Sequence, residues 1–286
     1  MSARSSDASA VLPFLKWPGG KRWIAGQIAE IVDRELHGRY FEPFLGGGAV
    51  YFRLLPESAV LSDINRELID TYRAVRDHPN EIVRRLKKIS VDESTYYRLR
   101  SERSESAIRR ATRFLYLNRT AFGGLYRLNA RGEFNVPFGG GQRTPAILWE
   151  RGLLEAASSA LQKASLRHCD FESQVSKAER GDVVYCDPTY TVAHANNGFV
   201  RYNERVFRWR DQVRLSTSLH QACSRGATVL LSNADHPSVR KLYPRAEALL
   251  LARPSAVSTD ISKRGPVSEV LLILRPSRRT STRVSS

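Results

Sequence analysis

Short apolar runs alternate with amphipathic stretches over much of this chain. The apolar runs are rich in β-branched or aromatic residues, which predicts buried strands at residues 40–44, 59–62, 166–169, 182–187, 228–232 and 269–274. Apolar positions recur with helical spacing between these runs, at residues 21–36, 67–76 and 209–224. Strands that alternate with helices in this way are typical of an α/β fold built on a doubly wound sheet.

The alternation is interrupted in the middle of the chain. Three helical patterns follow one another there without an intervening strand, at residues 81–89, 94–103 and 107–117. We therefore predict a catalytic α/β domain formed by residues 1–70 and 150–275. Residues 71–149 are predicted to form an inserted, mostly helical domain.

Charge is concentrated in the predicted insert. The chain of 286 residues has 45 Lys and Arg against 29 Asp and Glu, a formal net charge of +16. Residues 71–149 contain 16 basic and 7 acidic side chains, so over half of the excess lies in about a quarter of the chain. The sign predicts a phosphate-bearing partner without saying which nucleic acid, and it makes the insert the expected binding surface. Residues 276–286 are rich in Ser, Thr and Arg and are expected to form a disordered basic tail.

Several classes of protein are disfavoured by composition. The three cysteines are too few and too scattered for a disulfide framework or a zinc site. The chain has no run of 18 apolar residues, and its N-terminus lacks the apolar segment of a secretory signal. We therefore expect a soluble cytoplasmic protein with no metal and no membrane span.

The predicted strand at residues 182–187 ends in Asp187, Pro188, Thr189 and Tyr190. The Asp187 carboxylate and the Pro188 carbonyl can each accept one proton of an amine, and the Tyr190 ring can stack on a flat base. A strand-ending turn is the alternative interpretation. Cys186 is interpreted as a packing residue, since no His lies in the tetrad to activate it.

Glycines at the ends of two predicted elements suggest a cofactor site. Gly46, Gly47 and Gly48 follow the first strand, where a bare backbone can approach a ligand, although a simple turn would have the same composition. Asp63 ends the second strand and could bind a ribose diol or cap the next helix. Lys21 follows a Pro-Gly-Gly turn and could bind an anion or be an ordinary solvated lysine.

Two further segments could recognise bases. Asp170 and Phe171 end a predicted strand and suit the amine and the face of an adenine, or a helix cap beside a core ring. Residues 122–138 are predicted to form a glycine-hinged hairpin that carries an arginine suited to bidentate contact with guanine. Packing of this hairpin on the insert, with its arginines on phosphate, is the open alternative.

These segments occur together in an order that resembles the Dam-like DNA adenine methyltransferases. The matching segments are residues 14–21 (FLKWPGGK), 42–48 (EPFLGGG), 63–65 (DIN), 114–119 (FLYLNR), 126–129 (YRLN), 132–139 (GEFNVPFG) and 187–190 (DPTY). The resemblance covers roughly residues 14–274. It implies a Rossmann-like, S-adenosylmethionine-dependent enzyme that methylates N6 of adenine in double-stranded DNA, with GATC as target. Neither a metal nor an oligomer is required.

The resemblance also implies roles for individual residues. Asp187, Pro188 and Tyr190 would hold the flipped adenine. The cofactor pocket would comprise Trp17, Lys21, Phe44, Gly46, Gly47, Gly48, Asp63, Asp170 and Phe171. DNA would be contacted by Lys16, Arg119, Phe122, Leu125, Arg127, Asn129 and Pro137, with Phe122 near the position of a side chain that enters the base stack.

Adenine N6 is a poor nucleophile, because its lone pair is delocalised into the ring, and a duplex hides it. The base must therefore be flipped out. Two acceptors on the amine draw the nitrogen toward a pyramidal geometry, so that catalysis consists mostly of positioning and electrostatics.

The chain departs from the family pattern at two places. Most relatives have a second proline at the position of Thr189, and a proline there restrains Pro188. If the lost restraint is worth about 1.4 kcal/mol, turnover falls roughly tenfold. Gly123 stands where relatives often have Asn, and residues 139–141 are all glycine where a bulkier recognition residue is expected, so the residues that read the target differ from the family pattern here.

Other functions are alternatives to DNA methylation. A DNA-binding relative with a weakened or inactive catalytic site would share the basic insert. A methyltransferase for RNA or for a protein amide, and a nicotinamide oxidoreductase, would share the glycine loop and the acid. The amide enzymes generally have Asn in place of Asp187, and an oxidoreductase does not account for residues 187–190.

Overall fold

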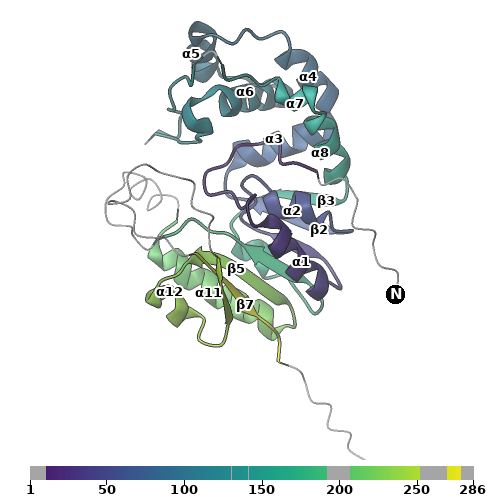
Figure 1. Ribbon diagram of the computed structural model, residues 1–286, viewed down its shortest axis with the longest axis vertical. Helices are drawn as coiled ribbons and strands as arrows, with labels where there is room; N and C mark the ends of the chain where they lie inside the picture. The colour runs from purple at the N-terminus through teal and green to yellow at the C-terminus, as the bar shows by residue number, and fades with distance from the viewer. Residues whose placement is uncertain (1–10, 130, 141, 192–206, 252–268, 278–286) are drawn as a thin grey trace, which may run out of the picture. The chain divides into compact units, whose positions relative to one another are not determined.

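The computed structural model describes residues 11–129, 131–140, 142–191, 207–251 and 269–277. The chain forms two compact units (Figure 1). The first comprises residues 1–33 and 45–168, and the second comprises residues 34–44 and 169–286. The fold is α/β and Rossmann-like, as the alternation of strands and helices predicted.

The first unit contains two parallel strands, and helices precede and follow the first of them along the chain. Strand β2 (Ala59–Asp63) pairs with β3 (Ala164–His168) in the register Ala59↔Ala164 to Asp63↔His168. Along the chain, the glycine loop lies between β1 (Tyr40–Glu42) and α2 (Ala49–Leu54), and β2 leads into α3 (Arg66–Asp77). Helix α8 (Leu153–Leu161) packs against α3 and precedes β3.

The chain between β2 and β3 is helical, as predicted. It contains α4 (Pro79–Leu86), α5 (Glu93–Ser101), α6 (Ala107–Thr120), the 3₁₀ turn η1 (Phe122–Gly124) and α7 (Ile147–Glu150). Helix α6 packs against α3, α4 and α5 (Figure 1). Antiparallel bridges pair Ala121 with Phe138 and Leu128 with Phe134, which makes the predicted hairpin. The bounds 71 and 149 of a separate domain stay a prediction, because these helices share one compact unit with β2 and β3.

The second unit contains five strands in the order β1-β4-β5-β7-β6. Strands β1 (Tyr40–Glu42), β4 (Val183–Cys186) and β5 (Thr228–Ala234) are parallel, whereas β7 (Glu269–Leu274) runs antiparallel to β5 and to β6 (Glu247–Leu251). Every residue of β4 and β5 is buried. Continuous apolar runs therefore correspond to central strands with both faces covered.

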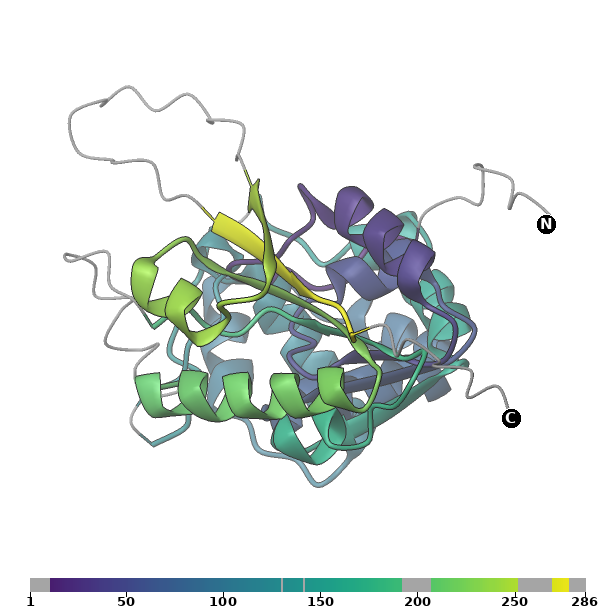
Figure 2. The same cartoon turned by 90° about the horizontal axis from the view of Figure 1, so that it is seen from below.

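Within the described residues, helices accompany these strands. Helix α11 (Trp209–Ser224) lies against β5 and buries Leu215, Leu219 and Ala222, which are spaced at three and four residues (Figure 2). Helix α9 (Glu172–Val175) packs on α11, and α12 (Pro237–Leu242) follows β5. Helix α1 (Ala25–Glu35) spans the boundary between the two units along the chain.

All six predicted strands are present, but some bounds and elements were wrong or missing. Helix α1 begins at Ala25 and not at residue 21, because Lys21 to Trp23 form a turn in which Ile24 N donates to Lys21 O at 3.0 Å. Strand β6 was not predicted. Four of its five residues are exposed, and Leu250 is 65% exposed, so its leucines do not mark a core. Of the predicted tail at residues 276–286, residues 278–286 lie outside the described residues.

Candidate active site

The segment that contains Trp17 is fixed by helix α6. Asn118, near the end of that helix, accepts from Lys16 N at 2.9 Å and donates to Lys16 O at 2.7 Å. Its neighbour Arg119 donates to the carbonyl of Phe14. Arg22 donates to the carbonyls of Pro13 and Leu15, both at 2.6 Å. Both backbone hydrogen-bonding groups of Lys16 are thereby satisfied by a single side chain.

Arg119 has an internal role in this arrangement. It is 4% exposed, and burial lowers its pKa to about 10, with the charge of Arg22 adding to the effect. In the described residues its Nε has no hydrogen-bond partner. The guanidinium holds the Phe14 carbonyl, and a contact between Arg119 and DNA stays a prediction.

Lys21 is not the solvated lysine of the simpler interpretation. It is 4% exposed, and its ammonium donates to Gly19 O at 3.2 Å. Buried cations are rare unless they are paired. The Lys21 side chain is therefore held within the turn that follows Trp17.

The glycine loop is closely packed against Trp17. A β-carbon at position 46 would lie 2.7 Å from Cδ1 and 2.8 Å from Nε1 of Trp17, and φ of Gly46 is 47°. Any other residue would therefore displace the indole and strain the backbone. A β-carbon at position 47 would lie 3.1 Å from Cβ of Trp17. Trp17 and the loop thus pack against each other, and their role in a cofactor site stays a prediction.

Asp63 fastens the glycine loop to the end of β2. Its Oδ2 accepts from Gly46 N at 3.1 Å and its Oδ1 accepts from Asn65 N at 2.9 Å. Asn65 is the N-cap of α3, because its Oδ1 accepts from Leu68 N at 3.0 Å. The alternative in which Asp63 caps the helix is therefore wrong. Burial raises the pKa of Asp63, and the backbone donors Asn65 and Gly46 offset part of that rise.

Asp170 and Phe171 lie in the second unit beside a residue that the sequence did not single out. Arg214 of α11 donates to Asp170 Oδ1 at 3.1 Å and to Glu172 Oε2 at 2.7 Å, and its guanidinium lies 5.0 Å above the Phe171 ring. Asp170 Oδ1 also accepts from Glu172 N at 3.0 Å. Asp170 therefore lies in a turn before α9, but it is not the helix cap of the alternative interpretation, because Phe171 is the N-cap of α9 and no side chain caps that helix. Within the described residues, both of these contacts of Asp170 are made by its Oδ1.

The Phe171 ring belongs to a small aromatic cluster. It is 5% exposed and stacks on Phe44, with ring centroids 5.5 Å apart and an interplanar angle of 27°. Phe207 contacts both rings edge-on. The two predicted cofactor-site aromatics of this unit are thus in direct contact.

The tetrad that begins at Asp187 follows β4 directly. The strand ends at Cys186, and no helix or strand includes Pro188, which is buried. Tyr190 donates to Glu269 Oε2 at 3.0 Å, so the first residue of β7 anchors its ring. Burial raises the pKa of Tyr190, and the charges of Asp187 and Glu269 raise it further. The hydroxyl therefore stays protonated and can donate.

Cys186 is a packing residue, as interpreted from the sequence. It is fully buried, and burial together with the charges of Asp187 and Glu42 raises the pKa of its thiol well above the ordinary value. The reactive thiolate is therefore strongly disfavoured. All three cysteines are free thiols.

The hairpin exposes some predicted DNA-contacting side chains and uses others internally. Phe122, Arg127 and Pro137 are exposed. Asn135 accepts from Arg127 Nε at 2.8 Å and so sets the direction of the guanidinium. The Asn129 side chain accepts from Arg131 N and Glu133 N and donates to Glu133, so it holds the hairpin turn. A DNA contact by Asn129 stays a prediction.

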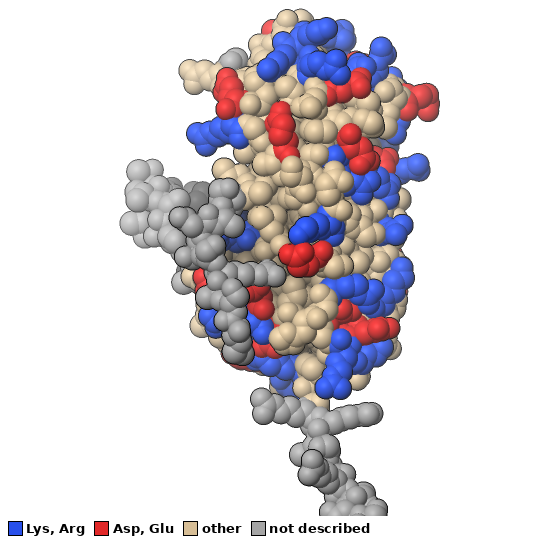
Figure 3. Space-filling view, turned by 90° about the vertical axis from the view of Figure 1, so that its right-hand side faces the viewer, with Lys and Arg blue, Asp and Glu red and all other residues tan. Residues whose placement is uncertain are grey.

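Lys16 lies against the start of the hairpin. A β-carbon at Gly124 would lie 2.5 Å from Cδ of Lys16, so only glycine leaves room for the lysine stem. Burial lowers the pKa of Lys16, and the nearby charges of Arg119, Arg143 and Arg22 lower it further. A positive potential therefore gathers here. By contrast, on the face of the molecule drawn in Figure 3, acidic side chains lie among the basic ones.

The structure thus brings the predicted residues together in separate groups within each unit. Trp17, Gly46, Gly47 and Asp63 form one group in the first unit. Phe44, Asp170 and Phe171 form another in the second. Sequence reasoning missed the residues that orient them, which are Arg22, Asn118, Tyr126, Asn135, Arg214 and Glu269. Asn118, Tyr126 and Asn135 lie inside matching segments, but the others carried no signal.

The described residues contain neither a metal-binding cluster nor a membrane-spanning helix. No group of three or more His, Cys, Asp or Glu side chains in this part of the chain is arranged to hold a metal ion. None of the helices in the described ranges has the length and apolar character needed to cross a membrane.

Comparisons with known proteins are consistent with one family. Residues 17–253 match the model of the D12 class N6 adenine-specific DNA methyltransferases. The chain is 35% identical over 270 residues to the type II methyltransferase M1.LlaDCHI of Lactococcus lactis subsp. cremoris, covering 91% of this chain and 94% of the relative. It is 35% identical over 246 residues to the type II methyltransferase M.MjaIII of Methanocaldococcus jannaschii, covering 78% and 84%. It is 33% identical over 270 residues to the DNA adenine methylase of Escherichia coli K12, covering 92% and 95%. With the family matched over most of its length, the chain belongs to the D12 class of N6 adenine-specific DNA methyltransferases.

Proposed function

We propose that this DNA adenine methyltransferase transfers a methyl group from S-adenosylmethionine to N6 of an adenine that is flipped out of double-stranded DNA. In this proposal the Asp187 carboxylate and the Pro188 carbonyl accept hydrogen bonds from the two N–H groups of the amine, and Tyr190 stacks on the base. As the N–C bond forms and the S–C bond of the cofactor breaks, N6 gives up one of its two protons. S-adenosylmethionine supplies a methyl group on a positively charged sulfur. The chain supplies positioning and a preorganised set of acceptors.

The observation that carries the proposal is the state of the tetrad. A central, fully buried strand ends at Cys186, so Asp187 and Pro188 are set on a rigid element. Pro188 lies outside helix and strand, so its carbonyl is not used in a sheet ladder. Glu269 accepts from the Tyr190 hydroxyl at 3.0 Å, which fixes one end of the stacking ring. Residues that must be held within tenths of an ångström are thereby supported from a second strand.

The residues proposed for the cofactor fit an adenosine that carries an amino acid. Asp63 accepts from the backbone of Gly46 and Asn65, with Ile64 as a further backbone donor, and an ionised carboxylate has about four lone-pair sites, so it keeps capacity for a ribose hydroxyl. The glycine loop offers bare backbone, with the Trp17 indole packed on it. In the other unit, Asp170 has an oxygen for an adenine amine beside the Phe171 ring. Lys21 is proposed to face the carboxylate end.

The target is proposed to be GATC in duplex DNA. Lys16, Leu125, Arg127 and Pro137 are proposed to contact the site, with Phe122 entering the stack. Support comes from the exposure of Phe122, Arg127 and Pro137 and from the guidance of Arg127 by Asn135. Arg127 is suited to bidentate contact with guanine O6 and N7. Contacts by Arg119 and Asn129 are also proposed, although both side chains have internal partners.

Substitution of Asp187 tests the proposal. We expect Asp187→Ala to reduce methyl transfer about 10²-fold or more, because one of two acceptors on the amine is lost. Binding of S-adenosylhomocysteine should change little. Transfer of labelled methyl groups to duplex DNA gives the rate, and sequencing of modified bases in DNA from expressing cells gives the target. Asp33→Ala, at an exposed position of α1, is the control. An undiminished rate in Asp187→Ala would exclude the proposed role.

Thr189 is the residue that favours the alternative function, a DNA-binding relative with a weakened or inactive catalytic site. It follows Pro188 where a second proline would restrain the carbonyl. The slower turnover expected from Thr189 stays a prediction. Absence of any methyl transfer by the unaltered protein would favour the alternative.

A further inference from the structure

Tyr126 lies between two residues proposed to contact DNA, yet its own ring points into the first unit. It is 7% exposed, between Leu125 and Arg127 in the sequence. Its ring contacts Phe114 at 5.3 Å and Phe134 at 5.7 Å between centroids. Its closest aromatic neighbour is Trp17, at 5.0 Å with an interplanar angle of 23°. The hairpin segment that carries Leu125 and Arg127 is therefore anchored in the core by the stacking of Tyr126 on the Trp17 indole.

Trp17 is held from two sides. One edge of the indole lies against the glycine loop, where a β-carbon on Gly46 would come within 2.7 Å of Cδ1. The Tyr126 ring stacks on it. The backbone just before Trp17 is fixed by Asn118. A shift of Tyr126 would therefore be transmitted to Trp17 and to the loop backbone, since close-packed groups cannot move independently.

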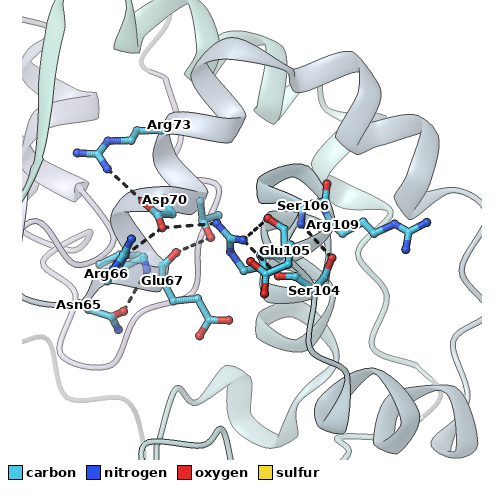
Figure 4. A network of polar contacts seen from close by, with 12 residues as sticks. Asn65, Arg66, Glu67, Asp70, Arg73, Ser104, Glu105, Ser106 and Arg109 are labelled. Atoms are coloured by element: carbon cyan, nitrogen blue, oxygen red, sulfur yellow. Dashed lines mark hydrogen bonds and ion pairs between the residues drawn. The ribbon is translucent and has the colours of Figure 1, made fainter.

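Tyr126 is also connected to the helix that follows Asp63. Its hydroxyl lies 3.5 Å from Glu67 Oε2, at the limit of a hydrogen bond, and Glu67 Oε1 accepts from Arg113 Nη1 at 2.9 Å. Burial raises the pKa of Glu67, and Arg113 partly offsets that rise. Helices α3 and α6 are joined again nearby, where Asp70 pairs with Arg110 at 3.9 Å (Figure 4).

The same ion-pair network surrounds the start of α3. Asp70 is also paired with Arg66 and Arg73, and Asn65 caps the helix in the same region (Figure 4). Arg113 further donates to the carbonyls of Leu99 and Arg100, both at 2.7 Å. The Asp63 turn, α3, α6 and the hairpin are therefore held together around the Tyr126 ring.

We infer that Tyr126 is a positioning residue that couples cofactor binding to target recognition. Its ring holds Trp17 against the glycine loop, while its backbone places Leu125 and Arg127. DNA that orders the hairpin therefore orders the indole, and a cofactor that orders the indole orders the hairpin. The inference rests on the proposed roles of Trp17 in the cofactor pocket and of the hairpin in DNA contact.

Coupling of this kind is reciprocal, so each ligand must tighten the other by the same factor, typically about 5- to 150-fold. The test uses titration calorimetry to measure binding of S-adenosylhomocysteine, with and without a duplex that contains the enzyme's target sequence. We expect at least fivefold tightening in the unaltered protein. Tyr126→Phe should keep it, because the ring stays, whereas Tyr126→Leu should reduce the factor to about one. Tyr97→Leu, which removes an exposed ring of α5, should keep the full factor.

A double-substitution cycle separates coupling from a general loss of stability. If Tyr126 acts through Trp17, combining Tyr126→Leu with Trp17→Leu should lower the coupling no further than either change alone. Tyr126→Met keeps a large apolar side chain between Phe114 and Phe134 and takes the place of Tyr126→Leu should that variant unfold.

The outcomes distinguish failure of the inference from failure of the proposed function. If Trp17→Leu leaves S-adenosylhomocysteine binding unchanged, the cofactor assignment of Trp17 is overturned. If Trp17→Leu weakens binding but Tyr126→Leu and Tyr126→Met retain the full coupling factor, the role of Tyr126 is overturned and the proposed function stands. Absence of coupling in the unaltered protein also overturns the inference.

Discussion

At the scale of single residues, Asp63 joins the glycine loop to the end of β2. Asp63 was expected at the end of a strand, and it is there. Its two oxygens are each tied to a backbone donor, and Asn65, two residues later, is the helix cap. A sequence shows that an acid follows a strand. Which residue becomes the helix cap depends on the backbone angles there, and the start of a helix can shift by one or two residues without any change in the sequence pattern.

Asp63 gives a pH dependence with opposite signs for binding and for stability. Its pKa is raised above the usual 3.8, mainly by burial. Only the ionised carboxylate can accept a hydrogen bond from a ribose hydroxyl in addition to its backbone donors, so acidification through this raised pKa should weaken cofactor binding. Stability changes in the other direction. Because the folded protein binds the proton more tightly than the unfolded chain, the contribution of Asp63 to stability falls as pH rises from about 3.8 through the folded pKa.

Titration of S-adenosylhomocysteine at several pH values checks this expectation. Affinity should begin to fall at a higher pH than an ordinary aspartate would cause. In Asp63→Asn the affinity should be lower throughout and its dependence on pH flatter. A profile of the same shape in both proteins would mean that another group controls binding.

At the scale of elements, the order of strands and helices could be predicted, but the contacts that orient the site could not. Helix α11 was predicted with its observed bounds, yet nothing in its periodicity indicated that Arg214 covers Phe171. Arg214 is an ordinary polar position of an amphipathic helix until Asp170 and Glu172 are placed beside it. Likewise, Asn118 and Arg119 belong to a recognisable segment, but their role in clamping residues 14–16 depends on a contact across 102 residues of sequence.

The clamp formed by α6 should contribute to stability. Asn118→Ala removes the acceptor for Lys16 N and the donor to Lys16 O, and unsatisfied backbone groups of this kind cost about 1–3 kcal/mol. We expect a loss of that size in the free energy of unfolding, measured by chemical denaturation. Asn135→Ala is the matched control, since the Asn135 partner Arg127 is exposed and can turn to water, and its loss should be smaller. Equal effects of the two substitutions would argue against a structural clamp at Lys16.

At the scale of the whole molecule, net charge indicated the kind of partner and left its place open. The excess of +16 predicted a polyanion, and the family to which the chain belongs acts on DNA. The face in Figure 3 carries acidic side chains among basic ones, so composition alone does not mark a binding surface. Some cations do not reach the protein surface at all, because the side chains of Arg119 and Arg113 are buried.

Binding to DNA should depend steeply on salt. If as few as two phosphates are neutralised, a rise in monovalent salt from about 50 to 200 mM should weaken binding by about tenfold, because condensed counterions are released on binding. Fluorescence anisotropy with a labelled duplex measures this slope. Binding of S-adenosylhomocysteine, which carries no net charge at neutral pH, serves as the control and should change little. DNA affinity that is independent of salt would contradict contacts with phosphate.

The sequence by itself determined the class of fold, the order of its elements and the residue types at the strand ends. These follow from periodicity and from local chemistry, which act over a few neighbouring residues. Only the tertiary structure decided which side chains orient the site. Stacking of Tyr126 on Trp17 joins positions 109 residues apart, and the contact of Glu269 with Tyr190 joins positions 79 residues apart. Such pairs exist only after the chain has packed, because no local pattern encodes the distance between residues that folding brings together.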